Sequence, residues 1–259
     1  MQDFENPDYT VCLVGHGTRD QAGINEFWAL SSKFKERNPN RIVECGFLEY
    51  AEPDIDKAIS NCVRRGAKSI VVVPGLLTQA RHAKKDIPEK VIEFSKKYPS
   101  LNFKCGGPLG FHPNIIKVCA KRIESAETHS KPGIKRNETL LLTVGRGSSD
   151  PEANSVADKA SQSLYEIMGF GGSETGFIGT SEPLFEDVLE TSVGLGFKRI
   201  IIFPYFLFTG VLVKKIFSMT DNTQKKYPEI EFLKAQYLNH DELIIDVFME
   251  RVQEAQANI

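Results

Sequence analysis

The chain repeats itself after 130 residues, and this repeat constrains its fold more than any other feature. VCLVGHGTRD at 11–20 returns as LLTVGRGSSD at 141–150. The same offset holds for Glu52-Pro53 with Glu182-Pro183 and for Lys84-Lys85 with Lys214-Lys215. KKYP at 96–99 returns at 225–228, an offset of 129, so the second copy has lost one residue. A register held over so many landmarks indicates one fold used twice. We expect a first lobe over residues 1–130 and a second over 131–259.

Within the first copy, short apolar or β-branched runs alternate with helical patterns. The runs at 11–14, 42–48, 69–74 and 101–105 predict strands. Apolar residues at helical spacing predict helices over about 24–34, 55–62, 88–97 and 113–125, the second ending at Gly66. This alternation predicts an α/β fold in which each copy forms a parallel, flavodoxin-like sheet of four or more strands. Ligands of such sheets bind beyond the carboxyl ends of the strands.

Three candidate metal ligands follow three consecutive predicted strands: His16, Glu49 and His82. Two imidazoles and a carboxylate can bind a divalent transition metal, and imidazole can also accept protons at neutral pH. Each residue alone has a plainer explanation as an exposed histidine or a solvated carboxylate. Glu52, repeated as Glu182, fits a helix-capping carboxylate. His112 in GFHPN is expected to order a turn.

The second copy serves as a control for these candidates. At the positions of His16, Glu49 and His82 it has Arg146, Gly179 and Leu212, so the fold does not require the three residues and a functional role is favoured. It carries instead cationic and hydroxyl groups on the corresponding rim, which are suited to binding carboxylates: Arg146, Ser148, Ser149 and Lys214, with Lys215 nearby. The alternative is a degenerate site with solvated charges.

The composition excludes several other classes of protein. A formal net charge of −2 argues against a general attraction to nucleic acid or anionic membranes. No apolar run is long enough to span a membrane, and the N-terminus lacks the features of a signal peptide, so a cytoplasmic location is expected. The 5 cysteines form no C-x-x-C pair and are expected to be reduced thiols. No G-x-x-x-x-G-K-[ST] sequence supplies a nucleotide-phosphate cradle.

The chain resembles the class II chelatases that act on sirohydrochlorin, in their long, duplicated form. The resemblance extends from about Tyr9 to Val252. It rests on the segments LVGHGTRD, FLEYAEPDID, VVPGLLTQARHAKKDIPEKV, VGRGSSDPEAN and FPYFLFTGVLVKKI.

The resemblance implies a lyase with a cleft between its lobes that inserts a divalent metal into sirohydrochlorin without ATP, for sirohaem or cobalamin biosynthesis. By the family pattern, His16 and His82 bind the metal and assist deprotonation, and Glu49 is the accompanying carboxylate. The eight carboxylates of the substrate give Arg146, Ser148, Ser149 and Lys214 a purpose. The metal is a substrate, and no tightly bound cofactor is implied. Long cobalt-associated members often carry a histidine-rich segment and a cysteine motif after the core. This chain ends at Ile259 with neither, which favours Fe²⁺ over Co²⁺ by a small margin.

Two other interpretations compete with a chelatase. A non-catalytic tetrapyrrole or metal carrier would use the same rim and release its ligand unchanged. A phosphatase with His16 as nucleophile would have an arginine directly before the histidine, where this chain has Gly15. With both lobes in one chain, a monomer can hold a full cleft, so a monomeric protein is compatible with the sequence.

Overall fold

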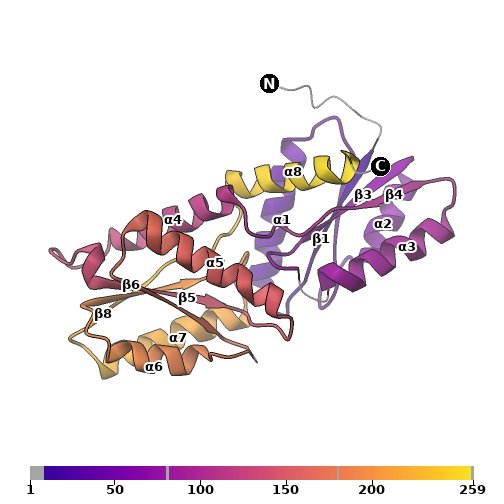
Figure 1. The fold of residues 1–259 in the computed structure, drawn as a ribbon. Coiled ribbons are helices and arrows are strands. Elements are labelled where there is room, and N and C mark those ends of the chain that lie inside the picture. The colour runs from indigo at the N-terminus through magenta and orange to yellow at the C-terminus, as the bar shows by residue number, and fades with distance from the viewer. Residues whose placement is uncertain (1–8, 80–81, 180, 258–259) are drawn as a thin grey trace. The chain divides into compact units, whose positions relative to one another are not determined.

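The computed structural model describes residues 9–79, 82–179 and 181–257, with the backbone alone at His82. Two four-stranded parallel sheets organise them (Figure 1). The first sheet has the order β2-β1-β3-β4, with β1 at Thr10–Gly15, β2 at Val43–Phe47, β3 at Ser69–Gly75 and β4 at Asn102–Cys105. The second has the order β6-β5-β7-β8, with β5 at Thr139–Gly145, β6 at Gly172–Phe177, β7 at Arg199–Pro204 and β8 at Glu231–Lys234. The predicted α/β fold with two parallel sheets is confirmed.

The helices alternate with these strands. In the first copy they are α1 (Gln21–Glu36), α2 (Ile55–Arg64), the π-helix η1 (His82–Asp86), α3 (Ile87–Lys97) and α4 (Pro113–Glu127). In the second copy they are the 3₁₀-helix η2 (Arg136–Glu138), α5 (Pro151–Met168), α6 (Phe185–Val193), α7 (Val211–Lys226) and α8 (Glu242–Ala257). The four helices predicted for the first copy are present, and Gly66 lies just beyond α2 in the left-handed region (φ +84°), as a helix-terminating glycine does.

The compact units do not follow the sequence repeat. Unit 1 comprises Met1–Gly110 and Ile244–Ile259, and unit 2 comprises Phe111–Leu243. The helix that follows the fourth strand of each copy therefore packs with the other copy: α4 belongs to unit 2 and α8 to unit 1. The division expected at residue 130 follows the repeat rather than this packing. Helical periodicity shows that a helix has an apolar face, but it does not show which sheet that face will cover.

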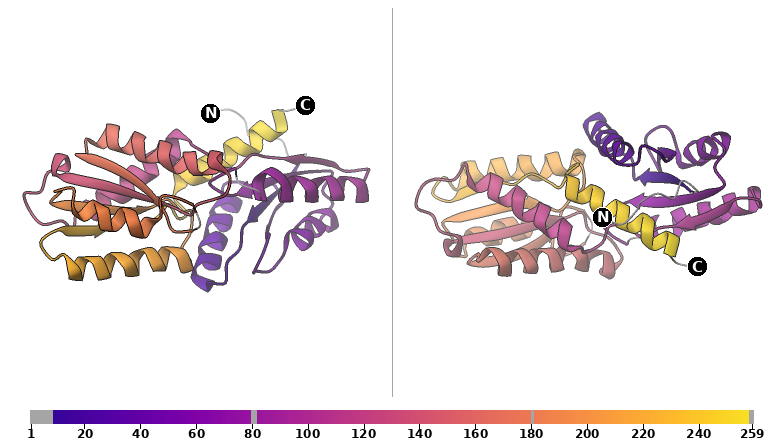
Figure 2. Two further views of the ribbon diagram at one scale, coloured as in Figure 1. Left: turned by 60° about the horizontal axis from the view of Figure 1, so that its bottom comes forward. Right: turned by 90° about the horizontal axis from the view of Figure 1, so that it is seen from above.

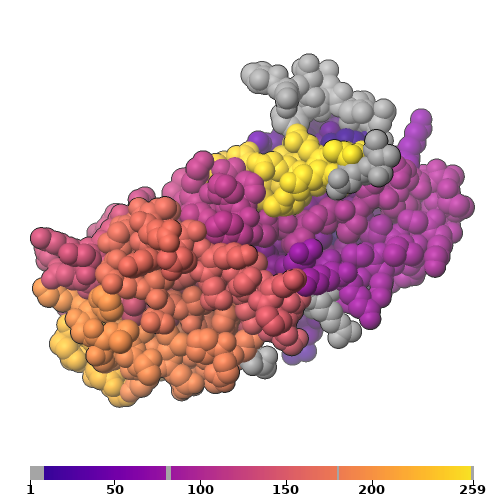
Figure 3. All heavy atoms as spheres, viewed as in Figure 1, coloured from indigo at the N-terminus to yellow at the C-terminus, as the bar shows by residue number. Residues whose placement is uncertain are grey.

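Helix α8 is bound to unit 1 by both apolar and polar contacts. Phe248 of α8 meets Phe34 of α1 edge to face, with ring centroids 6.4 Å apart. The guanidinium of Arg251 donates to two backbone carbonyl groups at residues 108 and 109, at 2.9 and 2.8 Å. Helix α8 lies beside α1 in Figure 1 and against the purple residues of unit 1 in Figure 3. The end of the chain thus completes the core of its first unit.

Helix α4 is bound to unit 2 by a buried charge network. The Arg199 side chain is only 4% exposed, and it donates to Glu127 of α4 at 3.1 Å. It also donates to the hydroxyl groups of Ser130 at 2.8 Å and Thr139 at 2.9 Å. Arg136 forms a second ion pair with Glu127, at 2.6 Å. The buried guanidinium is therefore paired and hydrogen-bonded, as burial of a charge requires.

Helices cover both faces of each sheet. In unit 2, α4 and α5 lie on one side of the sheet and α6 and α7 on the other (Figures 1 and 2). In unit 1, α2 and α3 contribute Ile59, Ile87 and Phe94 to an apolar cluster with the strands. Strand β1 is buried along its whole length, as expected for a central parallel strand.

The cysteines of the described residues agree with the sequence expectation. Four cysteines are buried and Cys105 is half-buried, and all 5 are free thiols, as predicted. Among the helices of residues 9–79, 82–179 and 181–257, none has the length and apolar character needed to cross a membrane.

Candidate functional site

The turn between β1 and α1 is shaped by residues that recur in both copies. In unit 1 the hydroxyl of Thr18 accepts the Asp20 N–H at 3.1 Å, and the Asp20 carboxylate accepts the Ala22 N–H at 3.1 Å. Asp20 thereby caps α1. The glycine of the turn, Gly17, has φ +86°. This geometry holds the preceding residue, His16, at the carboxyl end of the central strand.

Unit 2 builds the same turn from the same kinds of residue. The Ser148 hydroxyl accepts the Asp150 N–H at 3.1 Å, and Asp150 caps α5 by accepting the Glu152 N–H at 3.0 Å. Gly147 has φ +83°. The two turns differ mainly at the residue presented, which is His16 in one and Arg146 in the other. The shared residues therefore form the fold, whereas the presented residue is free to differ.

The backbone brings His16 and Glu49 together. The N–H of Leu48 donates to the Gly15 carbonyl and the N–H of Glu49 to the His16 carbonyl, both at 3.0 Å, so the ladder between β1 and β2 continues past the strand ends. A Cβ atom on Gly17 would lie 1.7 Å from the Glu49 carbonyl oxygen. Only glycine allows the two segments to approach so closely. Two of the three predicted metal ligands are thus neighbours on one rim of unit 1.

The hydrogen bonding of His16 indicates which nitrogen can bind a metal or a proton. Nδ1 lies 3.0 Å from the Gly17 carbonyl oxygen. Because a carbonyl oxygen can only accept, Nδ1 is the donor and carries the hydrogen of the neutral ring. Nε2 then bears the lone pair. A histidine whose Nδ1 is fixed by a backbone carbonyl is the usual arrangement for binding through Nε2. The His16 residue is half-buried, and Glu49 is exposed.

The third candidate, His82, is the first residue of the π-helix η1, which follows β3. Strand β3 pairs with β1 as far as Gly75 and Gly15, so both strands end at the same edge of the sheet. The segment that leads to η1 therefore leaves the sheet at the edge where the other two candidates lie. The His82 side chain lies outside the part of the chain that the structure describes. No three histidine, cysteine, aspartate or glutamate side chains within that part are grouped closely enough to hold a metal ion. The grouping of all three candidates stays a prediction.

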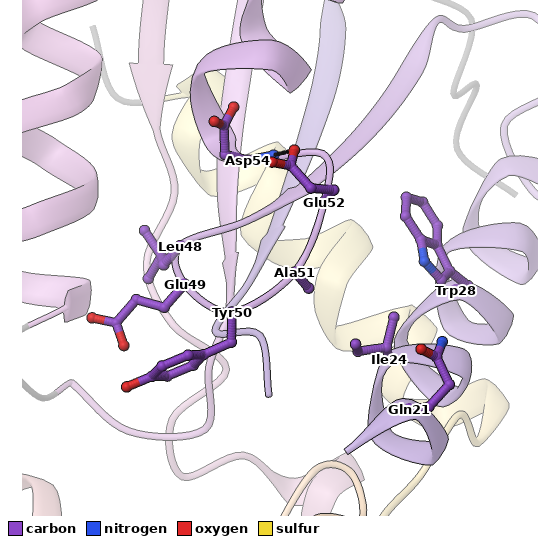
Figure 4. Close-up of a pocket in the computed structure, with 9 residues that line it drawn as sticks. All are labelled: Gln21, Ile24, Trp28, Leu48, Glu49, Tyr50, Ala51, Glu52 and Asp54. Carbon is purple, nitrogen blue, oxygen red and sulfur yellow. Dashed lines mark hydrogen bonds between the residues drawn. The ribbon is translucent and has the colours of Figure 1, made fainter. Parts of the chain in front are cut away.

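An open pocket of about 660 Å³ adjoins Glu49 on unit 1. It is lined by α1 and by the segment after β2: Gln21, Ile24, Trp28, Leu48, Glu49, Tyr50, Ala51, Glu52 and Asp54. Figure 4 shows Glu49 and Tyr50 projecting to one side of that segment, away from Gln21 and Trp28. The Arg19 guanidinium lies over the Tyr50 ring, 4.9 Å from its centroid. An exposed carboxylate, an aromatic face and a cation are therefore gathered on one rim.

Tyr50 and Arg19 were not among the residues that the sequence singled out. Tyr50 is 57% exposed and has φ +61°, a left-handed conformation that is unusual for a bulky side chain. Such strain is concentrated at functional sites. The only available sequence signal was position, because Tyr50 directly follows Glu49 at the end of a predicted strand.

Glu52 and His112 have structural roles, although the carboxylate that caps α2 is Asp54 rather than the expected Glu52. Glu52 accepts the Asp54 N–H at 3.1 Å, and its counterpart Glu182 accepts the Leu184 N–H, also at 3.1 Å. The pair stabilises the same turn in both copies. His112 caps α4, where its Nδ1 accepts the Asn114 N–H at 3.1 Å. These three polar residues are therefore explained by the fold.

The rim of unit 2 is cationic and has no room for a counterpart of the Glu49 side chain. Arg146, Ser149 and Lys214 are exposed. A Cβ atom on Gly179, the counterpart of Glu49, would lie 2.4 Å from the Arg146 carbonyl oxygen. A carboxylate side chain there would therefore require the backbone to move. Ser148, a predicted substrate contact, already uses its hydroxyl oxygen within the turn.

The fold and the rim of unit 1 define a duplicated α/β protein whose sites have diverged, one presenting histidine and carboxylate and the other arginine. The CbiX family pattern matches residues 10–126 and again residues 140–255. The chain belongs to this family.

Several relatives of known name match nearly the whole chain. The sirohydrochlorin cobaltochelatase of Priestia megaterium is 36% identical over 95% of this chain and 79% of its own. The sirohydrochlorin ferrochelatase of Bacillus subtilis is 30% identical over 96% of this chain and 92% of its own. Among solved structures, SirB from Bacillus subtilis with Fe³⁺ superposes with a TM-score of 0.83 and 28% identity, covering 97% of this chain and 96% of that one.

Proposed function

We propose that the chain catalyses the insertion of a divalent metal, Fe²⁺ or Co²⁺, into sirohydrochlorin. Membership of the CbiX family and the relatives named as chelatases support the reaction. The single observation that carries it is the juxtaposition of His16 and Glu49 on the rim of unit 1, with Nε2 of His16 bearing the lone pair. The turns that bear this pair recur in unit 2, where both residues are replaced.

The reaction exchanges two protons for one metal ion. Two pyrrole N–H bonds break, the two nitrogens bind the metal together with the two that already bear lone pairs, and two protons leave. A neutral imidazole can bind the incoming metal through Nε2 and, once the metal has passed to the ring nitrogens, accept a proton at the same Nε2 near pH 7. The Glu49 carboxylate lowers the energy of a dication beside it and is a second proton acceptor. Holding metal and ring together converts an encounter of two solutes into a step within one complex.

We assign His82 the role of a second metal ligand and base, following the family pattern. We also propose that Arg146, Ser149 and Lys214 bind substrate carboxylates. The exposure of all three and the positive charges of Arg146 and Lys214 support this role, since guanidinium and ammonium groups form strong hydrogen bonds to carboxylates. We include Ser148, whose hydroxyl oxygen accepts the Asp150 N–H and whose O–H is the group that donates to a carboxylate. We propose no bound cofactor, a cytoplasmic location and a monomeric protein.

The metal is the finer part of the proposal. Imidazole and carboxylate ligands bind Fe²⁺ less tightly than Co²⁺ in most sites, so ligand type alone does not select iron. The identity to the Priestia megaterium cobaltochelatase, 36%, exceeds the identity to the Bacillus subtilis ferrochelatase, 30%. These values do not add support to the preference for Fe²⁺ drawn from the sequence.

Anaerobic insertion of Fe²⁺ and of Co²⁺ into sirohydrochlorin, followed by its absorbance at substoichiometric protein, tests the reaction. We expect many turnovers per chain above the spontaneous rate, and the ratio of the two rates identifies the preferred metal. Stoichiometric binding of sirohydrochlorin without turnover would contradict the chelatase and support a carrier.

A further inference from the structure

The first copy contains one residue more than the second, and backbone hydrogen bonds locate it. After β3, the Leu109 N–H donates to the Leu76 carbonyl at 2.9 Å, and in unit 2 the Leu238 N–H donates to the Phe206 carbonyl at 3.0 Å. The acceptors are 130 residues apart, whereas the donors are 129 apart. The extra residue of the first copy therefore lies between 76 and 109.

The ends of the intervening helices narrow this interval. Tyr98 ends α3 with φ −126° and ψ 71°, and Tyr227 ends α7 with φ −127° and ψ 71°. Each N–H donates at 2.9 Å to the carbonyl four residues earlier. The two helix ends thus have one geometry at an offset of 129. The extra residue precedes them.

The pattern of burial narrows the interval further. Ala83 is buried as Val213 is, at an offset of 130, and Ile87 is buried as Ile216 is, at an offset of 129. Ile87 follows Ala83 by four positions, whereas Ile216 follows Val213 by three. The extra residue therefore lies between Ala83 and Ile87.

This interval lies within the π-helix η1, which spans His82–Asp86. A π-turn closes its hydrogen bond from i to i+5 and holds one residue more than an α-turn, so it accommodates a single insertion without rotating the helix on either side. In unit 2 the corresponding segment is continuous α-helix from Val211 to Lys226. Lys84 and Lys85, within the π-turn, are exposed, so packing of the core does not explain the insertion.

The insertion changes the backbone at the position of His82. In unit 2 this position is Leu212, in the first turn of an α-helix, where it packs half-buried against the apolar cluster of that unit. An α-helix would impose the same placement on residue 82 in unit 1. One added residue shifts a helical chain by about 1.5 Å and 100°. The π-turn therefore allows the backbone at residue 82 to leave the α-helical placement while α3 keeps its register.

We propose that the one-residue insertion folded as η1 is a positioning device for the metal-insertion step, which sets the backbone of His82 independently of α3. The proposal rests on the proposed function and extends it to a residue that need not touch metal or substrate. Loss of the insertion returns the segment to the α-helical register of unit 2. A displacement of about 1 Å at a reacting group can lower turnover about 100-fold.

Deletion of Lys85 tests the proposal, and Lys85→Ala is the matched control, since it removes the same side chain and keeps the residue count. The measurements are kcat and KM for metal insertion, the fluorescence titration of metal-free sirohydrochlorin, and thermal unfolding. We expect the deletion to fold, to bind sirohydrochlorin as the wild type does, and to lose about 100-fold in kcat. Lys85→Ala is expected to stay within about twofold of the wild type.

A second comparison separates positioning through His82 from a general defect. If the insertion acts through His82, deleting Lys85 in a His82→Ala background lowers kcat no further than His82→Ala alone. A folded deletion with wild-type kcat, a parallel loss of sirohydrochlorin binding, or additive losses in the double variant would each overturn the proposal. Unfolding of both the Lys84 and Lys85 deletions would also overturn it, because the residue would then serve the fold. A wild type without turnover would instead refute the proposed function.

Discussion

Gly17→Ala tests whether the close approach of two backbone segments holds the candidate site together. Gly17 has φ +86°, and a Cβ atom would lie 1.7 Å from the carbonyl oxygen of Glu49. That oxygen belongs to the backbone and cannot rotate away as a side chain could. The substitution must therefore push the β1–α1 turn away from the segment after β2. This movement pulls apart the hydrogen bond that the Glu49 N–H donates to the His16 carbonyl.

The expected loss of stability has two parts. A left-handed conformation costs alanine about 1 kcal/mol more than glycine. Loss of the hydrogen bond between Glu49 and His16 costs about 1 kcal/mol more. The free energy of unfolding should fall by about 2 kcal/mol or more. Turnover should fall about 100-fold, because His16 and Glu49 no longer lie side by side.

Gly66→Ala is the matched control. Gly66 has φ +84°, but a Cβ atom there meets nothing within 4 Å. It should lose only the conformational part, about 1 kcal/mol, and keep its turnover. Urea unfolding gives the stabilities, and initial rates of metal insertion give the turnover. Equal losses of stability in the two variants, or full turnover in Gly17→Ala, would refute the close approach as the basis of the site.

Three further outcomes follow from the contacts described above. Arg199→Met should lower the free energy of unfolding by about 3 kcal/mol in urea, because Glu127 keeps Arg136 but loses its buried partner, and the Ser130 and Thr139 hydroxyls lose a charged donor; a loss below 1 kcal/mol would contradict this. Tyr50→Asn should raise it by up to about 1 kcal/mol, since asparagine tolerates φ +61°, and a clear decrease would count against strain at that position. Burial raises the pKa of Cys45 and Cys105 to about 11, so below that pH both are thiols in the folded chain. Their labelling by a disulfide reagent should be slow at pH 8 and quicken about tenfold per pH unit, whereas rapid native labelling at pH 8 would disagree.

Much of the fold follows from local patterns in the sequence. The runs at 11–14 and 69–74 were predicted as strands because central parallel strands are buried on both faces, and β1 and β3 include them. The helical spacing of Phe27 and Phe34 predicted α1, and both are buried. The register of the repeat then placed the second copy without further information.

The partners of the last helices could not be predicted. The apolar face of α8 fits a helix over either sheet, and its contacts with Phe34 and with the carbonyl groups at 108–109 depend on the tertiary fold. The π-turn is different, since the change of offset from 130 to 129 already signalled an insertion. Only the burial of Ala83 and Ile87 showed where it lies.

Part of the candidate site could likewise be predicted from the sequence, and part of it could not. His16 and Glu49 were found from the sequence because both follow strands that end at one edge of a sheet, and the copies differ at both positions. The positions of Tyr50 and Arg19 on this rim were not predicted, because backbone strain and a ring–cation contact leave no periodic signal. The bond from the Asp150 N–H to the Ser148 hydroxyl was also not predicted, since it is formed only in the folded turn.

Glu49→Gln compared with Glu52→Gln tests the central claim most directly. Both carboxylates line the same pocket, and both variants replace one carboxylate oxygen with an NH2 group. Glu52 caps a turn that recurs in unit 2, and glutamine can still accept the Asp54 N–H. We predict that Glu49→Gln lowers kcat for metal insertion about 100-fold and that Glu52→Gln leaves it unchanged. Full activity in Glu49→Gln, or equal losses in both, would contradict a metal-insertion site built on Glu49 and His16.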